Sequence, residues 1–339
     1  MKESRRKMVP AVKIVATLSF AIILAFFGYL LFISLLVNPW LETNERELSV
    51  INFYSHKNIS EDPDIYFIGT SQFKEGIDCY IIEEDLKKAN ISFNCYNLAV
   101  NADSPLRRLT ELDSIIRSSP EIVVIGTEIK EIYQSAEIPN SRLILVANKV
   151  FLDNASLRFF NDKQRELLTL HPVKRAIENR IYVVSYLNYI TLNKISPNSV
   201  ADYEYRNNFK NPFQNIQNLS VQQKIEKIKN NVQENDTYSE FYGDSLNKLV
   251  FKHEIRELLN NNITVIIIDM PQDPLLPKYP SETTRNNYLS FINDTGAPYF
   301  DFDNAYPSTY FHDVMHMNIL GRTAFSHDAA RIIIREVEQ

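Results

Sequence analysis

Cysteine, glycine and positive charge are all scarce in this chain. The two cysteines and six histidines among 339 residues show no metal-ligand spacing, so we expect no metal site and no cofactor. Acidic residues outnumber basic ones by 42 to 36, which gives a net charge of −6, and nucleic acid is therefore not an expected partner. With 45% hydrophobic residues the chain can bury one good-sized core. Four of the seven glycines lie in or beside the motifs described below: Gly69, Gly76, Gly126 and Gly321.

The run from residue 14 to residue 37 has no charged side chain. At about 1.5 Å per residue it is long enough to cross a hydrocarbon core of roughly 30 Å, so we expect a transmembrane signal anchor. Residues 1–13 form a basic tail with five positive charges against Glu3, which predicts a cytoplasmic N-terminus and an extracytoplasmic remainder. A cleaved signal peptide is the rival interpretation, but the run is too long and no small-x-small cleavage site follows it before Pro39-Trp40. Residues 38–62 are expected to be a polar stalk.

The remainder, residues 63–339, alternates apolar strand patterns with amphipathic helix patterns. Strands are expected at Ile65–Ile68, Ile91–Val100, Glu121–Gly126, Ile263–Asp269 and Tyr299–Phe302. Helices are expected at Tyr80–Lys88, Leu106–Arg117, Ser281–Ile292 and Ile319–Val337. This alternation predicts an α/β fold, a three-layer α/β/α sandwich with a parallel sheet and right-handed crossovers.

Residues 128–261 interrupt the alternation. We expect a mostly helical insertion, with helices at Ser141–Phe151, Leu157–Leu170, Val173–Tyr189 and Val221–Asn231 and a polar stretch at residues 196–217. The insertion could form a lid, a docking surface for a membrane protein partner, or a platform facing the membrane.

Two short motifs at opposite ends of the domain carry the candidate chemistry. Gly69-Thr70-Ser71 follows the first strand, where the loops of a parallel sheet collect catalytic groups, although Ser71 alone could simply cap the next helix. Asp313-x-x-His316 opens the last helix and can place both side chains on one side of a turn. An ordinary histidine at a helix start is the plain alternative for His316, and His312 is expected to be a bystander.

Together these motifs resemble the SGNH (GDSL-like) hydrolase superfamily over roughly residues 63–335. The resemblance implies a flavodoxin-like sheet and an acyl-serine mechanism. It assigns the nucleophile to Ser71, the general base to His316 and the orienting carboxylate to Asp313. A serine hydroxyl needs such a base, together with hydrogen-bond donors for the tetrahedral oxyanion.

The donors are where the sequence departs from the superfamily. Ala102 stands in the second block where relatives have a glycine that donates its backbone N–H, and a backbone donor survives this change if φ permits. Glu128 stands in the third block where relatives have an asparagine, and an ionised carboxylate cannot donate. Either Thr127 or Asn101 substitutes, or Glu128 points away, or the enzyme is impaired. Loss of one such donor typically costs about 10²- to 10³-fold in rate.

The two cysteines and several asparagines suit an exported chain. Cys79 lies at the start of a helix and Cys95 in the second strand, so a disulfide would link the exit of the Ser71 loop to the sheet, and two buried free thiols are the alternative. Seven Asn-x-Ser/Thr sequons permit glycosylation, at Asn58, Asn90, Asn154, Asn218, Asn235, Asn262 and Asn293.

These patterns favour a single-pass cell-membrane protein with an extracytoplasmic serine esterase or O-acyltransferase domain. Its expected partners are the membrane, an acyl donor, and an acceptor on envelope glycan or lipid. The alternative is an impaired scaffold or binding subunit of an envelope complex. The two hypotheses differ in one distance, because only the enzyme requires the Ser71 hydroxyl within hydrogen-bond reach of His316.

Overall fold

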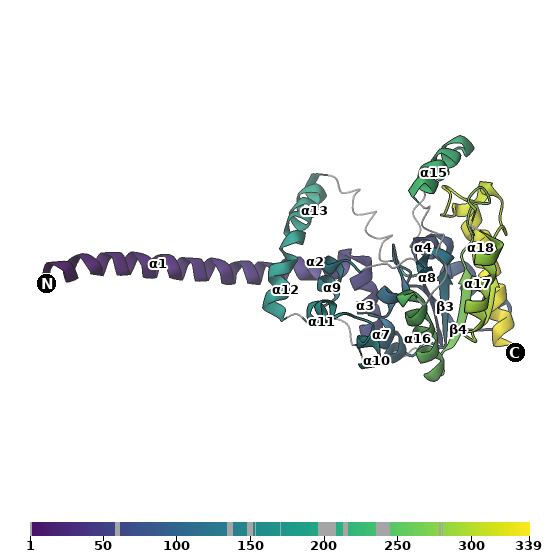
Figure 1. Ribbon diagram of the computed structural model, residues 1–339, viewed down its shortest axis with the longest axis horizontal. Coiled ribbons are helices and arrows are strands. Elements are labelled where there is room, and N and C mark those ends of the chain that lie inside the picture. Colours follow the sequence, from purple (N-terminus) through teal and green to yellow (C-terminus); the bar gives the residue numbers. More distant parts are fainter. Residues whose placement is uncertain are drawn as a thin grey trace.

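A computed structural model describes residues 2–57, 62–133, 138–147, 152, 154–169, 171–195, 208–212, 216–234, 245–277, 279 and 281–339 (Figure 1). The expected sequons at Asn58 and Asn235, the end of the helix expected up to Phe151, and most of the polar stretch 196–217 lie outside these residues.

The domain is built on one parallel sheet of five strands. These are β1 (Asp64–Ile68), β2 (Asn94–Asn97), β3 (Ile122–Thr127), β4 (Thr264–Asp269) and β5 (Tyr299–Asp301). They lie in the order β2-β1-β3-β4-β5, and the register pairs Ile65 with both Cys95 and Ile122. This is the flavodoxin-like order of a doubly wound sheet. The predicted α/β class is confirmed, although β2 is shorter than the predicted strand.

Alternate residues of the central strands pack into separate cores on the two faces of the sheet. Ile65, Phe67 and Val124 join the core formed with α4 (Ser71–Gly76), α5 (Cys79–Lys88) and α18 (Ile319–Val337). Tyr66, Ile68 and Val123 face the other core, to which further helices contribute: α3 (Arg46–His56), α6 (Pro105–Arg108), α7 (Leu112–Ser118), α16 (Leu246–Asn260) and α17 (Glu282–Asn293). Because both faces are covered, the strands are apolar throughout instead of alternating with polar residues.

The insertion between β3 and β4 is helical where it is described. Its elements are α8 (Ile129–Tyr133), α9 (Asn140–Val146), α10 (Asn154–Leu157), α11 (Asp162–Leu168), α12 (Pro172–Glu178), the 3₁₀-helix η2 (Asn179–Tyr182), α13 (Val183–Ile195) and α15 (Val221–Glu234). The boundaries expected at 128 and 261 are too wide. Both α8 and α16 contribute to the core, through Ile132 at one end and Val250, Phe251 and Ile255 at the other.

A long apolar helix projects from the domain at the N-terminal end (Figure 1). It consists of α1 (Lys2–Phe32), the π-helical turn η1 (Ile33–Val37) and α2 (Asn38–Asn44). Residues Val12–Leu41 make up a stretch of 30 residues that is long and apolar enough to cross a membrane. Most of its side chains are exposed, as those of a lipid-facing helix would be outside a membrane.

The expected polar stalk at residues 38–62 is wrong for most of that segment. Leu41 and the helix α3 pack into the domain, and Leu48, Ile51 and Tyr54 are buried in the core. The sequence of this segment looks polar because α3 also contains Arg46 and Glu47. Both charged side chains contact the domain. The N-terminal apolar helix is therefore joined to the α/β domain through α3, with a break in the helix at Glu45.

Candidate active site

Ser71 lies at the carboxyl end of β1, as the first residue of α4. The N-cap position of that helix belongs to Thr70, so capping does not account for Ser71. The helix starts within three residues of the strand because the strand end packs very closely. A Cβ on Gly69, whose φ is +152°, would lie 2.6 Å from the carbonyl oxygen of Gly126 on β3. A Cβ on Gly126 would in turn collide with the ring of Phe73.

Asp313 and His316 lie in a tight loop before α18, not within the start of that helix as expected. The loop is closed by an isolated antiparallel bridge between Phe311 and Met317 and by the His312 N–H, which donates to the carbonyl of His316 at 3.0 Å. The Asp313 carboxylate accepts the backbone N–H of Met315 at 2.8 Å and of His316 at 2.7 Å. The helix itself begins after Asn318, whose side chain caps it.

The structure brings the three predicted triad residues together. The distance from Ser71 Oγ to His316 Nε2 is 2.8 Å, and His316 Nδ1 lies 3.1 Å from Asp313 Oδ2. One ring nitrogen therefore faces the hydroxyl and the other faces the carboxylate. This is the geometry in which an imidazole accepts the serine proton while a carboxylate holds its tautomer.

The charges around His316 act in both directions on its pKa. Burial by itself lowers the pKa, but the hydrogen bond with Asp313 and the negative charge of Glu75 outweigh burial and raise the pKa above its ordinary value. The positive charge of Lys227 opposes the rise. Burial would raise the pKa of Asp313, yet hydrogen bonds with His316 and Lys227 hold it far below the ordinary value. The carboxylate is therefore ionised at neutral pH.

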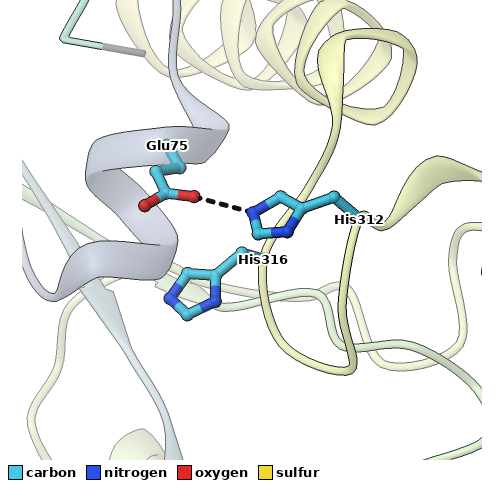
Figure 2. A group of neighbouring side chains, drawn as sticks. All are labelled: Glu75, His312 and His316. Carbon is cyan, nitrogen blue, oxygen red and sulfur yellow. Dashed lines mark hydrogen bonds and ion pairs between the residues drawn. The ribbon is translucent and has the colours of Figure 1, made fainter. Parts of the chain in front are cut away.

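His312 is not a bystander. Its ring is stacked on that of His316, with centroids 5.6 Å apart and planes 9° apart. Its Nε2 lies 3.0 Å from Glu75 Oε2, and both side chains are largely buried (Figure 2). Glu75 belongs to the same short helix as Ser71. A second carboxylate and imidazole pair thus lies beside His316.

The histidine spacing gave no expectation of a metal site, yet the fold collects three potential ligands. The ligand atoms of Glu75, His312 and His316 all lie within 4.8 Å of one another. Each already has a protein partner, because His316 uses both nitrogens on Ser71 and Asp313 while His312 is paired with Glu75. These hydrogen bonds account for the grouping without an ion.

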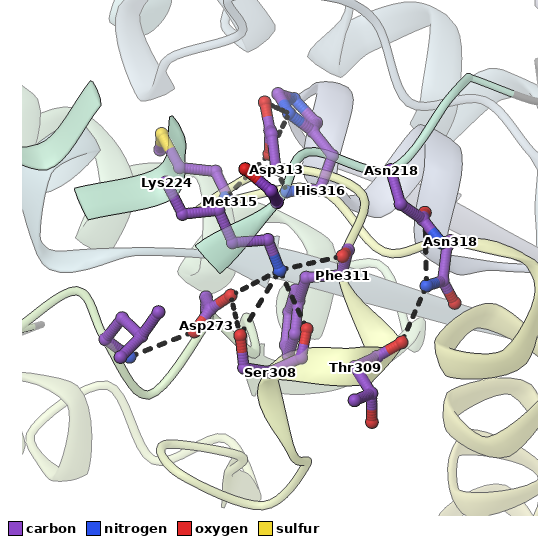
Figure 3. A network of polar contacts seen from close by, with 12 residues as sticks. Asn218, Lys224, Asp273, Ser308, Thr309, Phe311, Asp313, Met315, His316 and Asn318 are labelled. Atoms are coloured by element: carbon purple, nitrogen blue, oxygen red, sulfur yellow. Dashed lines mark hydrogen bonds and ion pairs between the residues drawn. The ribbon is translucent and has the colours of Figure 1, made fainter. Parts of the chain in front are cut away.

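Two lysines fix helix α15 of the insertion to the triad loop, and Figure 3 shows the contacts of the first, Lys224. The buried Lys224 ammonium contacts Asp273 Oδ2 at 2.8 Å and donates to the carbonyls of Ser308 at 2.8 Å and Phe311 at 2.9 Å. One turn further on, Lys227 Nζ lies 2.7 Å from Asp313 Oδ2. The insertion therefore reaches the catalytic carboxylate directly.

The candidate oxyanion donors of the second block lie on a constrained turn. Ala102 adopts φ +50°, which an alanine rarely does and which suits the position that is glycine in relatives. Arg107 Nη1 donates to the carbonyls of both Asn101 and Ala102, the latter at 2.7 Å. The side-chain oxygen of Asn101 accepts a hydrogen bond from Lys74 at 2.8 Å. Arg107 holds the carbonyl groups of this turn. The backbone N–H groups of the turn therefore have a fixed orientation as well.

The third block is buried at the end of β3. Thr127 is completely enclosed as the last residue of that strand. Glu128, also buried, accepts a hydrogen bond from Gln272 Nε2 at 2.7 Å through one carboxylate oxygen. Burial and then the charge of Glu128 raise the pKa of the neighbouring Glu131 well above its ordinary value. The side-chain amide of Gln272 therefore donates a hydrogen bond to the Glu128 carboxylate.

Two side chains of helix α3 contact the second block or the arginine that binds it. Arg46 donates to the carbonyls of Ala99 at 2.7 Å and Asn97 at 2.6 Å. Glu47 pairs with Arg107 at 3.1 Å, the residue that clamps the Ala102 turn. The segment between the anchor helix and the sheet is therefore part of the support of the site.

Of the two alternatives left open for Cys79 and Cys95, the structure has the disulfide, with Cα atoms 5.3 Å apart. It links the start of α5 to β2, and α5 follows the helix that carries Ser71.

Comparisons with known proteins find similarity at a low level. No protein-family model matches the chain, and no curated protein matches its sequence. Among solved structures, a GDSL-like lipase from Bacteroides thetaiotaomicron is 9% identical, with 85% of this chain and 98% of that chain covered at a TM-score of 0.39. An acetyl xylan esterase is 10% identical, covering 80% and 99% at a TM-score of 0.40. A catalytic mutant of an acetylxylan esterase from Geobacillus stearothermophilus is 9% identical, covering 80% and 94% at 0.39.

Three features of the site escaped the sequence analysis: the Glu75–His312 pair, the lysines of α15, and the support from α3. Glu75 and His312 are 237 residues apart, and Lys227 and Asp313 are 86 apart. No local pattern marks such contacts. The one available signal was the position of His312 directly before Asp313, which places it in the same loop as the Asp-x-x-His motif.

Proposed function

We propose that this chain is a membrane-anchored serine hydrolase that acts on acyl esters through an acyl-serine intermediate. One observation supports this above all others: the 2.8 Å contact between Ser71 Oγ and His316 Nε2, with Asp313 on the opposite ring nitrogen. An activated serine of this kind attacks a carbonyl carbon. We assign it to esters because its two motifs resemble those of the SGNH (GDSL-like) hydrolases.

Each step has a residue in place. His316 Nε2 takes the proton of the Ser71 hydroxyl as Oγ bonds to the ester carbonyl carbon. The tetrahedral oxyanion collapses, the alkoxide leaves with the proton from His316, and the acyl group remains on Ser71. Water or another hydroxyl then gives its proton to His316 and attacks the acyl-serine, which releases the serine. The N–H of Ala102 is the preferred oxyanion donor, since its turn is clamped by Arg107.

The second step decides between hydrolysis and transfer. A water molecule makes the protein an esterase, and a sugar or polyol hydroxyl makes it an O-acyltransferase. Because the basic residues lie before the apolar helix, on the side expected to face the cytoplasm, we place the reaction outside the cytoplasmic membrane, on acyl groups of envelope glycan or lipid. The domain boundaries in this proposal are a basic tail (1–13), an anchor (14–37) and a catalytic domain that includes α3.

The alternative of an impaired scaffold rests on Glu128 in the third block. Two observations favour the enzyme. The triad distances are those of a working site, and Glu128 is engaged by Gln272.

The test uses the full-length chain in lipid nanodiscs with p-nitrophenyl acetate as substrate. Ser71→Ala and His316→Gln should lower kcat by on the order of 10³-fold or more, and Ser290→Ala, an exposed serine on α17, should leave it unchanged. Added glycan that becomes acetylated would indicate transfer, and release of acetate alone would indicate hydrolysis. Full activity of the Ser71→Ala variant would overturn the proposal.

A further inference from the structure

A second helical segment, with charged residues in its first half and none from Val183 to Asn193, lies across the outer end of the anchor helix. It consists of α12, η2 and α13, which follow one another without a break over residues 172–195. Figure 1 shows this segment running across the end of α1, whereas α1 itself extends away from the domain. If α1 stands along the membrane normal, the segment lies along the membrane plane.

The two elements are joined by specific contacts. The ring of Tyr186 packs edge-on against Phe32 and Trp40, with centroids 5.9 and 5.7 Å away. The buried Asn179 donates to the side-chain oxygen of Asn38 at 3.0 Å. The position of the segment relative to the anchor is therefore fixed by packing and does not depend on the chain connections alone.

The length of the anchor sets the depth of this junction. Lys13 is the last charged residue before the apolar run. A hydrocarbon core of roughly 30 Å takes about 20 helical residues, so a core that begins at Ile14 ends near Ile33. The contacts of Tyr186 are with Phe32 and Trp40, on either side of that point. The segment therefore sits where hydrocarbon meets headgroups.

The side chains of α13 suit that location. No charged residue occurs from Val183 to Asn193. Val184 is 64% exposed and Leu187 is 44% exposed, one helical turn apart on the same side. Tyr182, Tyr186 and Trp40 are aromatic residues with a polar end, the type enriched at membrane interfaces. Helix α13 contacts η1, whose Leu35 and Leu36 are also exposed.

We propose that residues 172–195 form an in-plane helix embedded in the outer lipid interface, with Val184 and Leu187 in contact with lipid. This inference rests on the proposed membrane anchoring of α1. Lipid is the expected occupant because the exposed face adjoins the face that lipid must cover on the anchor. With two attachments to the membrane, the catalytic domain is held at a fixed height and orientation, which suits a substrate that is itself tied to the membrane.

The test places one fluorescent probe at a time on the full-length protein in nanodiscs. The native cysteines are joined in the disulfide and the described residues contain no free cysteine, so an introduced cysteine is the single site for an NBD label. Leu187→Cys reports on α13, Ile23→Cys on the middle of the anchor, and Val337→Cys on the last turn of α18. The end of α18 lies at the opposite end of the molecule from α1 (Figure 1). Quenching by lipids with a nitroxide near the headgroup is the readout.

We expect the Leu187 label to be quenched roughly twofold or more by the shallow nitroxide, the Ile23 label to be quenched best by a nitroxide deep in the chain, and the Val337 label to resist both. A Leu187 label that stays unquenched while the Ile23 label is quenched would overturn the in-plane helix and leave the anchor intact. An unquenched Ile23 label would instead overturn the anchoring. A partner protein is not present in this sample, so a face that needs one would give the unquenched result.

A label-free measurement covers the case in which Leu187→Cys misfolds. Trp40 is the single tryptophan of the chain and contacts Tyr186. We expect its fluorescence to be quenched more strongly by lipids brominated close to the headgroup than by lipids brominated near the chain end. The reverse order, or no quenching, would contradict an interfacial junction.

Discussion

Lys227 Nζ lies 2.7 Å from Asp313 Oδ2, the same carboxylate oxygen that accepts from His316 Nδ1 at 3.1 Å. A lysine from the helical insertion therefore shares the carboxylate that faces His316. The insertion is not a separate appendage, because its charge lowers the pKa of His316, the proposed general base.

This arrangement predicts opposite pH effects from two substitutions. His316 must be neutral to accept the serine proton, and its raised pKa means that activity is lost as the pH falls through a value above about 6.5. Lys227→Met removes a charge that lowers this pKa, so the acid limb of kcat/KM should move to higher pH. Glu75→Gln removes a charge that raises it, so the limb should move to lower pH.

The matched control is Lys229→Met, which removes an exposed lysine from the same helix and should leave the limb in place. Shifts of Lys227→Met and Glu75→Gln in the same direction would contradict the assigned electrostatics. The shift from Lys227 should also shrink with added salt, because that side chain is 42% exposed.

The buried Lys224 predicts that α15 can be released without unfolding the domain. Lys224→Met leaves Asp273 buried without its ammonium partner, a loss of about 3–5 kcal/mol for a broken buried pair. We expect faster amide exchange over residues 221–229 and lower kcat/KM, with the sheet protected as in the wild type. Adding Asp273→Asn should recover part of the loss. Exchange that rises equally in β1, β3 and α15 would contradict a local role.

The contacts of α3 predict that a substitution in this helix, far from the triad in the sequence, lowers the rate of catalysis. Arg46→Met frees the carbonyls of Asn97 and Ala99, and small displacements of an oxyanion turn are costly. We expect kcat to fall by about 10- to 10²-fold with the fold retained. Arg331→Met, an exposed arginine on α18, is the control. Unchanged kcat in the Arg46 variant would show that the turn does not need this support.

Sequence patterns were sufficient where one local cause determines the structure. Ile65–Ile68 and Ile122–Ile125 are buried on both faces, so their apolar runs marked the central strands directly. The Gly-x-Ser and Asp-x-x-His spacings located the triad because each motif is confined to one turn. The helix at Ile319–Val337 has the bounds that its periodicity predicted.

Sequence patterns were not sufficient where a charged residue has a partner inside the protein, because in the sequence it looks the same as a charged residue that faces solvent. Arg46 and Glu47 make α3 look like a polar linker, and Lys224 and Lys227 make α15 look like a solvent-facing helix. In each case the partner is a distant residue, such as Arg107 for Glu47 or Asp273 for Lys224. Hydrophobic periodicity contains no information about such pairs, so only the folded arrangement reveals them.

The disulfide predicts a measurable share of the stability of the domain. Cys79 and Cys95 close a loop with a sequence separation of 16, and a loop of that size stabilises the folded state by about 3 kcal/mol in the chain-entropy account. The Cys79→Ala/Cys95→Ala double variant should lose about that much free energy of unfolding in urea, as should the wild type under reductant. Equal stability of oxidised and reduced protein would contradict a stabilising role.

The central claim is that Ser71 is an activated nucleophile, and covalent labelling tests it most directly. Full-length protein in nanodiscs would be treated with a fluorophosphonate probe and analysed by peptide mass spectrometry. We predict a single adduct on Ser71, absent from Ser71→Ala and strongly reduced in His316→Gln. A wild-type protein that does not react, or an adduct that persists in the Ser71→Ala variant, would contradict the account.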